Sequence, residues 1–121
     1  MIELVRPLLD WATLPRHNID ADQVIIDGSE PTSVLFYLTA GNASGRDGMN
    51  YIAGDMLGLC EVLALDRYVT QIQAIKRCTL IAIRREVLEA ALTRGGDLVL
   101  PISRSIAADI TQRRLVGLGL K

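Results

Sequence analysis

Residues 54–74 have the residue types and spacing of an anion-binding site. Gly54 and Asp55 form a turn signal, a short apolar segment containing Gly58 follows, and Arg67 stands before an alternating run. Glycine allows the backbone to approach a ligand closely, and free N–H groups at the start of a helix attract negative charge. A nearby arginine can complete such a site with paired hydrogen bonds to phosphate. The stretch therefore predicts a glycine turn, a short helix and a strand that together could bind a phosphate.

The same stretch resembles the phosphate-binding cassette of cyclic-nucleotide-binding domains, as in the effector half of bacterial catabolite-activator-type regulators. The family sequence reads roughly Gly-Asp-x-Phe-Gly-Glu-(Leu/Met)-(Ala/Ser)-Leu, followed by Pro-Arg-Ala-(Ala/Thr)-Thr-Val-x-Ala. The matching residues are Gly54, Asp55, Leu57, Gly58, Ile72 and Ala74. The resemblance covers residues 19–94 and implies a mainly β fold. The expected architecture is an antiparallel β-roll, a jelly roll similar to that of cupins, with an N-terminal helix and two C-terminal helices.

The sequence departs from the family pattern at the two residues that hold the ligand. The glutamate that binds the ribose hydroxyl in the family corresponds to Leu59, and the phosphate-binding arginine corresponds to Tyr68. Arg67 lies one place early, and a one-residue slip in a strand points a side chain to the other face unless a bulge restores it. Glu61 lies two positions beyond the expected glutamate, which on a helix is the wrong side. We therefore expect a conserved scaffold in which both polar anchors are lost or displaced.

These departures favour a regulatory domain that acts through a protein partner or another ligand. One charge-assisted hydrogen bond contributes about 1.5–3 kcal/mol, so losing two anchors removes roughly a hundredfold or more of affinity. The alternative is a cyclic AMP or cyclic GMP sensor in which Arg67 and the backbone of Gly58 and Leu59 hold the phosphate. The candidate pocket residues are Gly54, Asp55, Leu57, Gly58, Leu59, Cys60, Glu61, Arg67, Tyr68 and Val69.

Composition indicates one soluble, well-cored domain over residues 1–121. Half of the residues are hydrophobic and 22% are charged, which is typical of a globular protein. The net charge of −1 gives no general attraction to nucleic acid or to an anionic membrane. No apolar run approaches the length of a membrane span. Glu3, Arg6 and Asp10 interrupt the apolar region that an export signal would need, which favours a cytoplasmic protein.

The sequence lacks the residues of a catalytic or metal centre. Cys60 and Cys78 do not form a Cys-x-x-Cys pair, and the one histidine, His17, is expected in a polar loop. A metal-dependent cupin site needs several histidine and carboxylate ligands at close spacing. Glu61 and Asp66 are better explained as surface or helix-end carboxylates than as an acid–base pair. We expect no enzyme and no cofactor, and a cyclic nucleotide is a candidate ligand only under the sensor alternative.

The hydrophobic pattern divides the chain into four parts. Residues 1–18 have helical spacing, residues 19–84 contain the short strands of the roll, and residues 85–96 and 97–121 form two helices. Strands are expected at 23–26, 34–40 and 77–84.

Residues 42–50 are the most loop-like segment of the roll. In the resembling family the corresponding hairpin is longer and more strand-like, so this one is expected to be abbreviated. Arg46 and Asp47 are interpreted as decoration of the hairpin.

The final helix carries an apolar stripe at Ile102, Ile106 and Ile110. The stripe could pack against its own domain, but the resemblance implies pairing with the same helix of a second copy, so we expect a homodimer. A third possibility is a subunit that docks this helix on a larger assembly. Arg113 and Arg114 suit the negative end of the helix dipole. Regulators of the resembling family continue into a helix-turn-helix module, for which the sequence leaves no room, so direct DNA binding is not expected.

Overall fold

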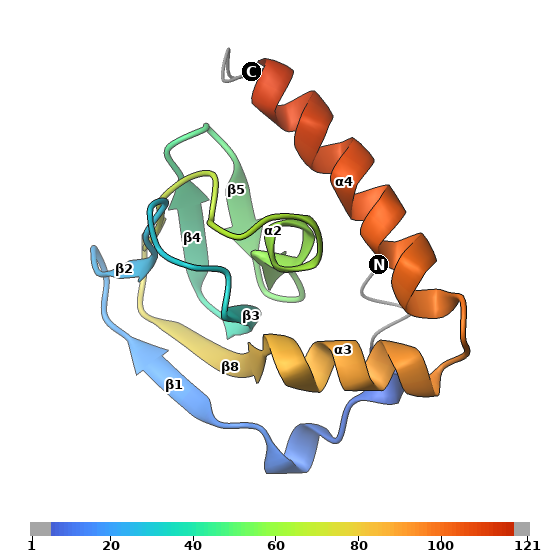
Figure 1. The fold of residues 1–121 in the computed structure, drawn as a ribbon. Helices are drawn as coiled ribbons and strands as arrows, with labels where there is room; N and C mark the ends of the chain where they lie inside the picture. Colours follow the sequence, from blue (N-terminus) through green and yellow to red (C-terminus); the bar gives the residue numbers. More distant parts are fainter. Residues whose placement is uncertain (1–5, 118–121) are drawn as a thin grey trace.

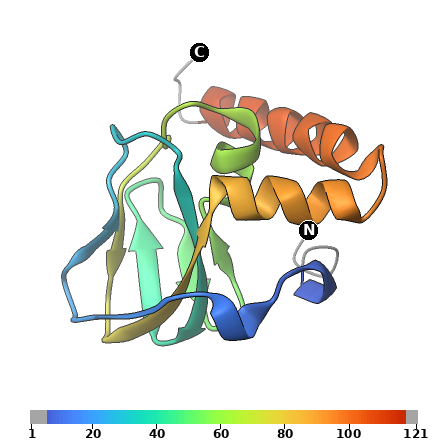
Figure 2. The ribbon, with the colours of Figure 1, turned by 60° about the horizontal axis from the view of Figure 1, so that its bottom comes forward.

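The computed structural model describes residues 6–117 of the chain, with side chains over residues 7–114. Two four-stranded antiparallel sheets form a β-roll, and three α-helices lie together on one side of it (Figures 1 and 2). The first sheet has the order β1-β8-β3-β6, from Arg16–Ile19, Cys78–Arg84, Val34–Ala40 and Met56–Leu57. The second has the order β2-β7-β4-β5, from Val24–Ile26, Ile72–Ala74, Asn42–Gly45 and Asn50–Ile52. The helices are α2 (Leu59–Ala64), α3 (Arg85–Arg94) and α4 (Val99–Gly117).

The antiparallel pair of β3 and β8 is the centre of the roll. Leu35 pairs with Ile83 and Leu38 with Leu80, and all four side chains are at most 1% exposed. Branched apolar residues at alternate positions favour strands because they pack on a pleated surface. The mainly β fold with flanking helices, predicted from the sequence, is confirmed. So are the expected strands at 23–26, 34–40 and 77–84, each within one residue at either end.

The N-terminal segment does not form the expected helix over its described residues. It contains two short 3-10 turns, Arg6–Leu8 and Trp11–Thr13, and then strand β1, which pairs with β8. Pro7 and Pro15 explain the difference, because proline removes a backbone donor and pushes the preceding residue out of helical geometry. His17 therefore lies on an exposed strand and not in a loop. The apolar position Leu4 and the charged residue Glu3 fall outside the described residues.

Residues 42–50 form the expected hairpin, but with more strand than their loop-like composition indicates. The segment forms the β-hairpin of β4 and β5, in which Ala43 pairs with Tyr51. Strand β4 also pairs with β7 on its other side. Pairing on both edges outweighs the weak strand propensity of its Asn, Ser and Gly residues, because propensity for strands depends strongly on context.

Helix α4 packs on the roll through small side chains. Ser103, Ala107 and Thr111 repeat every fourth residue and are at most 2% exposed, on the side that faces α2. Small residues let two helices approach closely, and Thr111 satisfies its hydroxyl by donating to the carbonyl of Ala107 at 2.8 Å.

The predicted isoleucine stripe lies next to this buried row on α4 and is largely exposed. Ile102, Ile106 and Ile110 are 53%, 46% and 42% exposed. The stripe is therefore not buried in its own domain, although Ile110 contacts a pocket beside α4, and pairing with a second copy stays a prediction. None of the helices in the described part of the chain has the length and apolarity to cross a bilayer.

Two alanines on α4 provide a test of this packing. We expect Ala107→Leu to lower the free energy of unfolding by about 1–3 kcal/mol, because a larger side chain must push α4 away from α2. Ala108→Leu is the matched control, since Ala108 is exposed and its enlargement is expected to change stability by less than about 0.5 kcal/mol. Urea unfolding of both variants measures the difference, and equal stabilities would contradict the packing described here.

Candidate functional site

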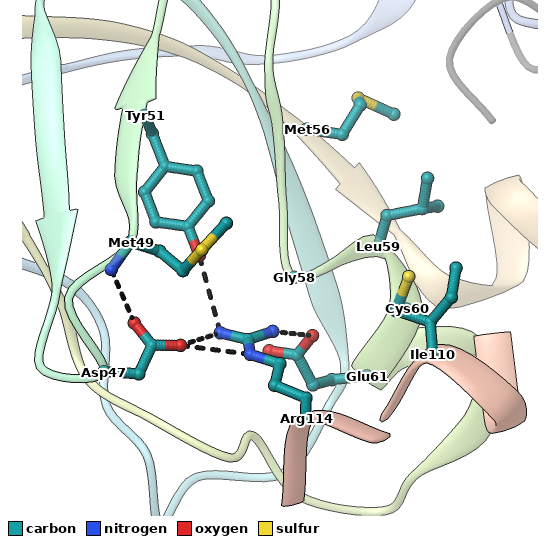
Figure 3. A pocket seen from close by; sticks show the side chains of 10 residues that line it. All are labelled: Asp47, Met49, Tyr51, Met56, Gly58, Leu59, Cys60, Glu61, Ile110 and Arg114. Carbon is teal, nitrogen blue, oxygen red and sulfur yellow. Dashed lines mark hydrogen bonds and ion pairs between the residues drawn. The ribbon is translucent and has the colours of Figure 1, made fainter. Parts of the chain in front are cut away.

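A pocket of about 490 Å³ lies between the roll and α4 (Figure 3). The hairpin β4–β5, strand β6, the first turn of α2 and the C-terminal half of α4 form its walls. Its lining residues are Asp47, Met49, Tyr51, Met56, Gly58, Leu59, Cys60, Glu61, Ile110 and Arg114. The anion-binding stretch predicted from the sequence thus supplies one wall, and two segments distant in sequence supply the others.

The opening turn of the predicted cassette shapes the backbone and does not line the pocket. Gly54 adopts a φ of 102°, and its N–H donates to the carbonyl of Leu38 at 2.7 Å. One carboxylate oxygen of Asp55 accepts a hydrogen bond from the N–H of Ile52 at 2.9 Å. Leu57 is fully buried in the core. These residues fix the path of the chain into α2.

The first turn of α2 brings three successive residues to the pocket. Leu59, Cys60 and Glu61 all line it, because α2 is enclosed between the roll and α4 and the pocket extends around its end. Leu59 is an apolar wall at the position where the resembling family has glutamate. Cys60 is a partly exposed free thiol whose pKa is raised by burial.

Tyr68 points into the roll, and Arg67 points out of it. Tyr68 is 6% exposed, its hydroxyl donates to the carbonyl of Val34, and its ring lies against Gly58. Arg67 is exposed and donates from Nη1 to the carbonyl of Ser29 at 2.8 Å.

The pocket walls do not include Arg67, Tyr68 or the adjacent Val69, which is half-buried. At the register of the family's phosphate-binding arginine, the structure therefore holds a buried phenol.

Glu61 lines the pocket and is buried, so its interpretation as a surface or helix-end carboxylate is wrong. Its side chain is 3% exposed, and one carboxylate oxygen accepts a hydrogen bond from Nη1 of Arg114 at 3.2 Å. Helix α4 packs against α2 and removes Glu61 from solvent. Glu61 and Asp66 do not form a pair, since Asp66 is exposed.

Asp47 is the second buried carboxylate of the site, and its interpretation as hairpin decoration is wrong. Its side chain is 3% exposed. One oxygen accepts the N–H of Met49 at 3.1 Å, and the other accepts Nε and Nη2 of Arg114 at 3.0 and 2.5 Å. The turn of the β4–β5 hairpin folds toward α4, which removes Asp47 from solvent.

Arg114 is the functional residue that the sequence analysis missed. Its guanidinium lies between the carboxylates of Asp47 and Glu61, and Nη2 lies 3.5 Å from the hydroxyl of Tyr51 (Figure 3). Helical spacing contained the signal, because position 114 continues the buried row of Ser103, Ala107 and Thr111 and therefore faces the domain. Arg113, by contrast, forms an exposed ion pair with Asp109 on the helix surface.

The ionisable groups of the pocket have shifted pKa values. Burial raises the pKa of Glu61 above 4.5, and the nearby Arg114 only partly offsets this. Burial also acts to raise the pKa of Asp47, but hydrogen bonds from Arg114 and from the N–H of Met49 outweigh it and leave this pKa below 3.8. Burial raises the pKa of Tyr51 as well. With both carboxyls ionised, the site holds two negative charges and one positive charge.

Sequence comparisons return no relative, whereas structural comparisons do. No family model matches the chain, and no curated protein matches it. The structure is similar to that of a PKAR CBD2 domain bound to Sp-2Cl-cAMPS, with a TM-score of 0.70 and 23% identity over 89% of this chain and 73% of that one. The chain has the fold of a cyclic-nucleotide-binding domain. A putative cyclic nucleotide-binding protein from Geobacter metallireducens matches with a TM-score of 0.64 and 14% identity, over 84% of this chain and 78% of that one.

A third similar structure comes from a kinase that does not depend on cyclic AMP. It is the regulatory subunit of a cAMP-independent protein kinase A from Trypanosoma brucei, with a TM-score of 0.69 and 19% identity. The match covers 94% of this chain and 47% of that subunit, so this chain corresponds to about half of its length. A mutant of that subunit with three substitutions, bound to cAMP in the A site, matches with a TM-score of 0.64 and 20% identity, over 84% of this chain and 41% of that one.

Within the described residues, no group of three or more His, Cys, Asp or Glu side chains is placed to hold a metal ion. The two buried carboxylates of the pocket, Asp47 and Glu61, instead form ion pairs with Arg114.

Replacing Arg114 is expected to change the pH dependence of stability. A carboxyl whose folded pKa is raised stabilises the fold below its unfolded pKa and loses that contribution as pH rises through the folded pKa. In Arg114→Met the pKa of Glu61 rises further, and Asp47 loses the partner that stabilises it above pH 3.8. We expect a cost of about 2–3 kcal/mol at neutral pH, larger at about pH 8 than at about pH 5.

Urea unfolding at both pH values measures this, with Arg113→Met as the matched control on the same helix. The control is expected to follow the wild type, since its ion pair is exposed. Parallel curves for Arg114→Met and the wild type would contradict the assignment.

Proposed function

We propose that this chain is a non-catalytic regulatory domain that uses the cyclic-nucleotide-binding fold without binding cyclic AMP or cyclic GMP in the usual manner of that fold. One observation carries the proposal. Of the described residues that line the pocket, Arg114 is the one cation, and two buried carboxylates already hold it. A cyclic phosphate entering this pocket would meet negative charge and would have to displace Asp47 or Glu61.

The cassette itself supports the same conclusion. The two family anchors correspond to Leu59 and Tyr68, and neither carries the positive charge that pairs with a phosphate. Tyr68 already uses its hydroxyl to donate to Val34, in the interior of the roll. A domain with these substitutions keeps the scaffold and lacks the chemistry that recognises the nucleotide.

The structural relatives show that this fold occurs with and without cyclic AMP dependence. The PKAR CBD2 domain is bound to a cyclic AMP analogue, whereas the Trypanosoma brucei subunit belongs to a cAMP-independent kinase. Three substitutions, one of which introduces an arginine, accompany bound cAMP in the mutant of that subunit. In this chain Arg67 is exposed and donates to the carbonyl of Ser29, so it does not reach into the pocket.

The second candidate is a sensor in which Arg67 holds the phosphate. Its side chain would first have to leave the carbonyl of Ser29 and turn into the roll past Tyr68. This movement is the reason that we place the sensor second.

Isothermal titration of cyclic AMP and cyclic GMP into the wild type and Arg67→Ala distinguishes the proposed regulatory domain from the sensor. We expect no heat from either protein up to millimolar nucleotide. Heat at micromolar nucleotide that disappears in Arg67→Ala would establish the sensor and remove the proposal.

Regulation through protein contact requires an exposed surface, and α4 offers one. Ile102 and Ile106 lie beside the buried row of the helix and are 53% and 46% exposed. Exposed isoleucines at one face of a helix are unfavourable in water and are typical of an interface. We propose that this face pairs with a second copy of the chain, and docking on a larger assembly is the alternative.

Sedimentation equilibrium distinguishes pairing with a second copy from docking on a larger assembly. We expect the wild type to be a dimer and the double variant Ile102→Asp/Ile106→Asp to be a folded monomer. Ala108→Asp is the control, because Ala108 is exposed on α4 but does not belong to the isoleucine face. A monomeric wild type would contradict self-pairing and direct attention to a different protein partner.

A further inference from the structure

The pocket is built to hold a planar cation. Asp47 accepts two N–H groups of Arg114 side by side on one oxygen, and Glu61 accepts a third from the other edge of the guanidinium. The side chains of both residues are only 3% exposed. Charge-assisted hydrogen bonds of this kind are about twice as strong as neutral ones. The guanidinium of Arg114 therefore shows which chemistry the two carboxylates recognise.

The negative charge of the site is not fully balanced. Two carboxylates face one guanidinium, and the second oxygen of Glu61 has no side-chain partner among the described residues. The hydroxyl of Tyr51 lies next to this group, 3.5 Å from Nη2 of Arg114. The two carboxylates thus carry one more negative charge than Arg114 balances, which is unfavourable for an anion and favourable for a cation.

The remaining walls of the pocket are apolar and adaptable. They are formed by Met49, Met56, Leu59 and Ile110, and their side chains face the cavity (Figure 3). Methionine side chains are flexible and fill irregular space, so they can close around ligands of different shape. A volume of about 490 Å³ falls in the range of small-molecule sites. The shape and lining suit a ligand with a short apolar body.

We propose that this pocket binds a small organic cation, a guanidinium or ammonium compound with an apolar body, that competes with Arg114 for Asp47 and Glu61. The inference rests on the proposed function, because it requires a pocket that does not take an anionic nucleotide. The ligand's cationic head replaces the guanidinium of Arg114, and its body lies against Met49 and Met56. Without the ligand, the side chain of Arg114 takes the position of the ligand's cationic head.

The competition connects the pocket to α4. Arg114 is held in the site by its ion pairs, while the rest of α4 is attached through Ser103, Ala107 and Thr111. A ligand that takes the two carboxylates releases Arg114 and weakens the attachment of the C-terminal turns of α4. A ligand shifts such an equilibrium only by its difference in affinity for the two states, and here that difference comes from the shared carboxylates.

Butylguanidinium is the probe that tests this inference. It carries the head group of Arg114 on a short apolar chain, so it can occupy the space that Arg114→Ala vacates. We expect it to bind Arg114→Ala at least about tenfold more tightly than the wild type, because the tethered competitor is gone. Arg113→Ala is the matched control and is expected to bind like the wild type. Asp47→Asn added to Arg114→Ala is expected to weaken binding by at least about tenfold.

Binding is measured by titration calorimetry and by shifts of the Met49 and Met56 methyl resonances. The wild type is measured in the same way, so the test does not depend on one variant, and Arg114→Met replaces Arg114→Ala if the alanine variant does not fold. Equal affinity of the wild type and the folded Arg114 variant, or no shift of these methyl groups in either, would overturn the inference. Butyltrimethylammonium serves as a cation without N–H donors, and equal binding of the two probes would also overturn it.

The two proposals fail in different ways. Heat from cyclic AMP at micromolar concentration removes the proposed function, whatever butylguanidinium does. Absence of a butylguanidinium response together with absence of a cyclic AMP response removes this inference and leaves the proposed function intact.

Discussion

The ion pairs of Arg114 with Asp47 and Glu61 are the interaction on which the arrangement of this molecule depends. They join three segments that are far apart in sequence, the turn of the β4–β5 hairpin, the first turn of α2 and the end of α4. Two carboxylates removed from water are stable only with a cation and hydrogen bonds nearby, and removing one partner of a buried pair is strongly destabilising. The position of α4 over the pocket, the character of the pocket and the surface left to partners all follow from this constraint.

Helix α4 therefore carries a buried row of small residues and, next to it, an exposed row of isoleucines. Its inner row of Ser103, Ala107 and Thr111 allows close contact with α2 and carries Arg114 to the pocket. Its neighbouring row of Ile102, Ile106 and Ile110 is exposed, and Ile110 also lines the pocket. Occupation of the pocket and the availability of this exposed row are thus properties of the same helix.

The parts of the fold that could be predicted are those with local signals. Branched residues over Val34–Ala40 between turn residues indicate a strand by themselves, and helix α3 is marked by its apolar spacing and by Gly95 and Gly96. The extent of the strands in the β4–β5 hairpin could not be predicted from its own residues, because pairing with β7 from elsewhere in the chain stabilises β4. The contact of Arg114 with Asp47 crosses 67 positions and leaves no local pattern at either residue. The resemblance identified the scaffold, while the ion pairs that give this pocket its own chemistry lie outside the cassette motif.

The coupling free energy between Arg114 and Asp47 tests this account most directly. A double-mutant cycle of Arg114→Met, Asp47→Asn and the double variant, measured by urea unfolding at neutral pH, isolates their interaction from the other effects of each substitution. The account predicts a coupling of about 1–3 kcal/mol, since both side chains are largely buried and share two hydrogen bonds. A coupling indistinguishable from zero would contradict it, and would mean that the pair of Arg114 and Asp47 does not hold α4 in place.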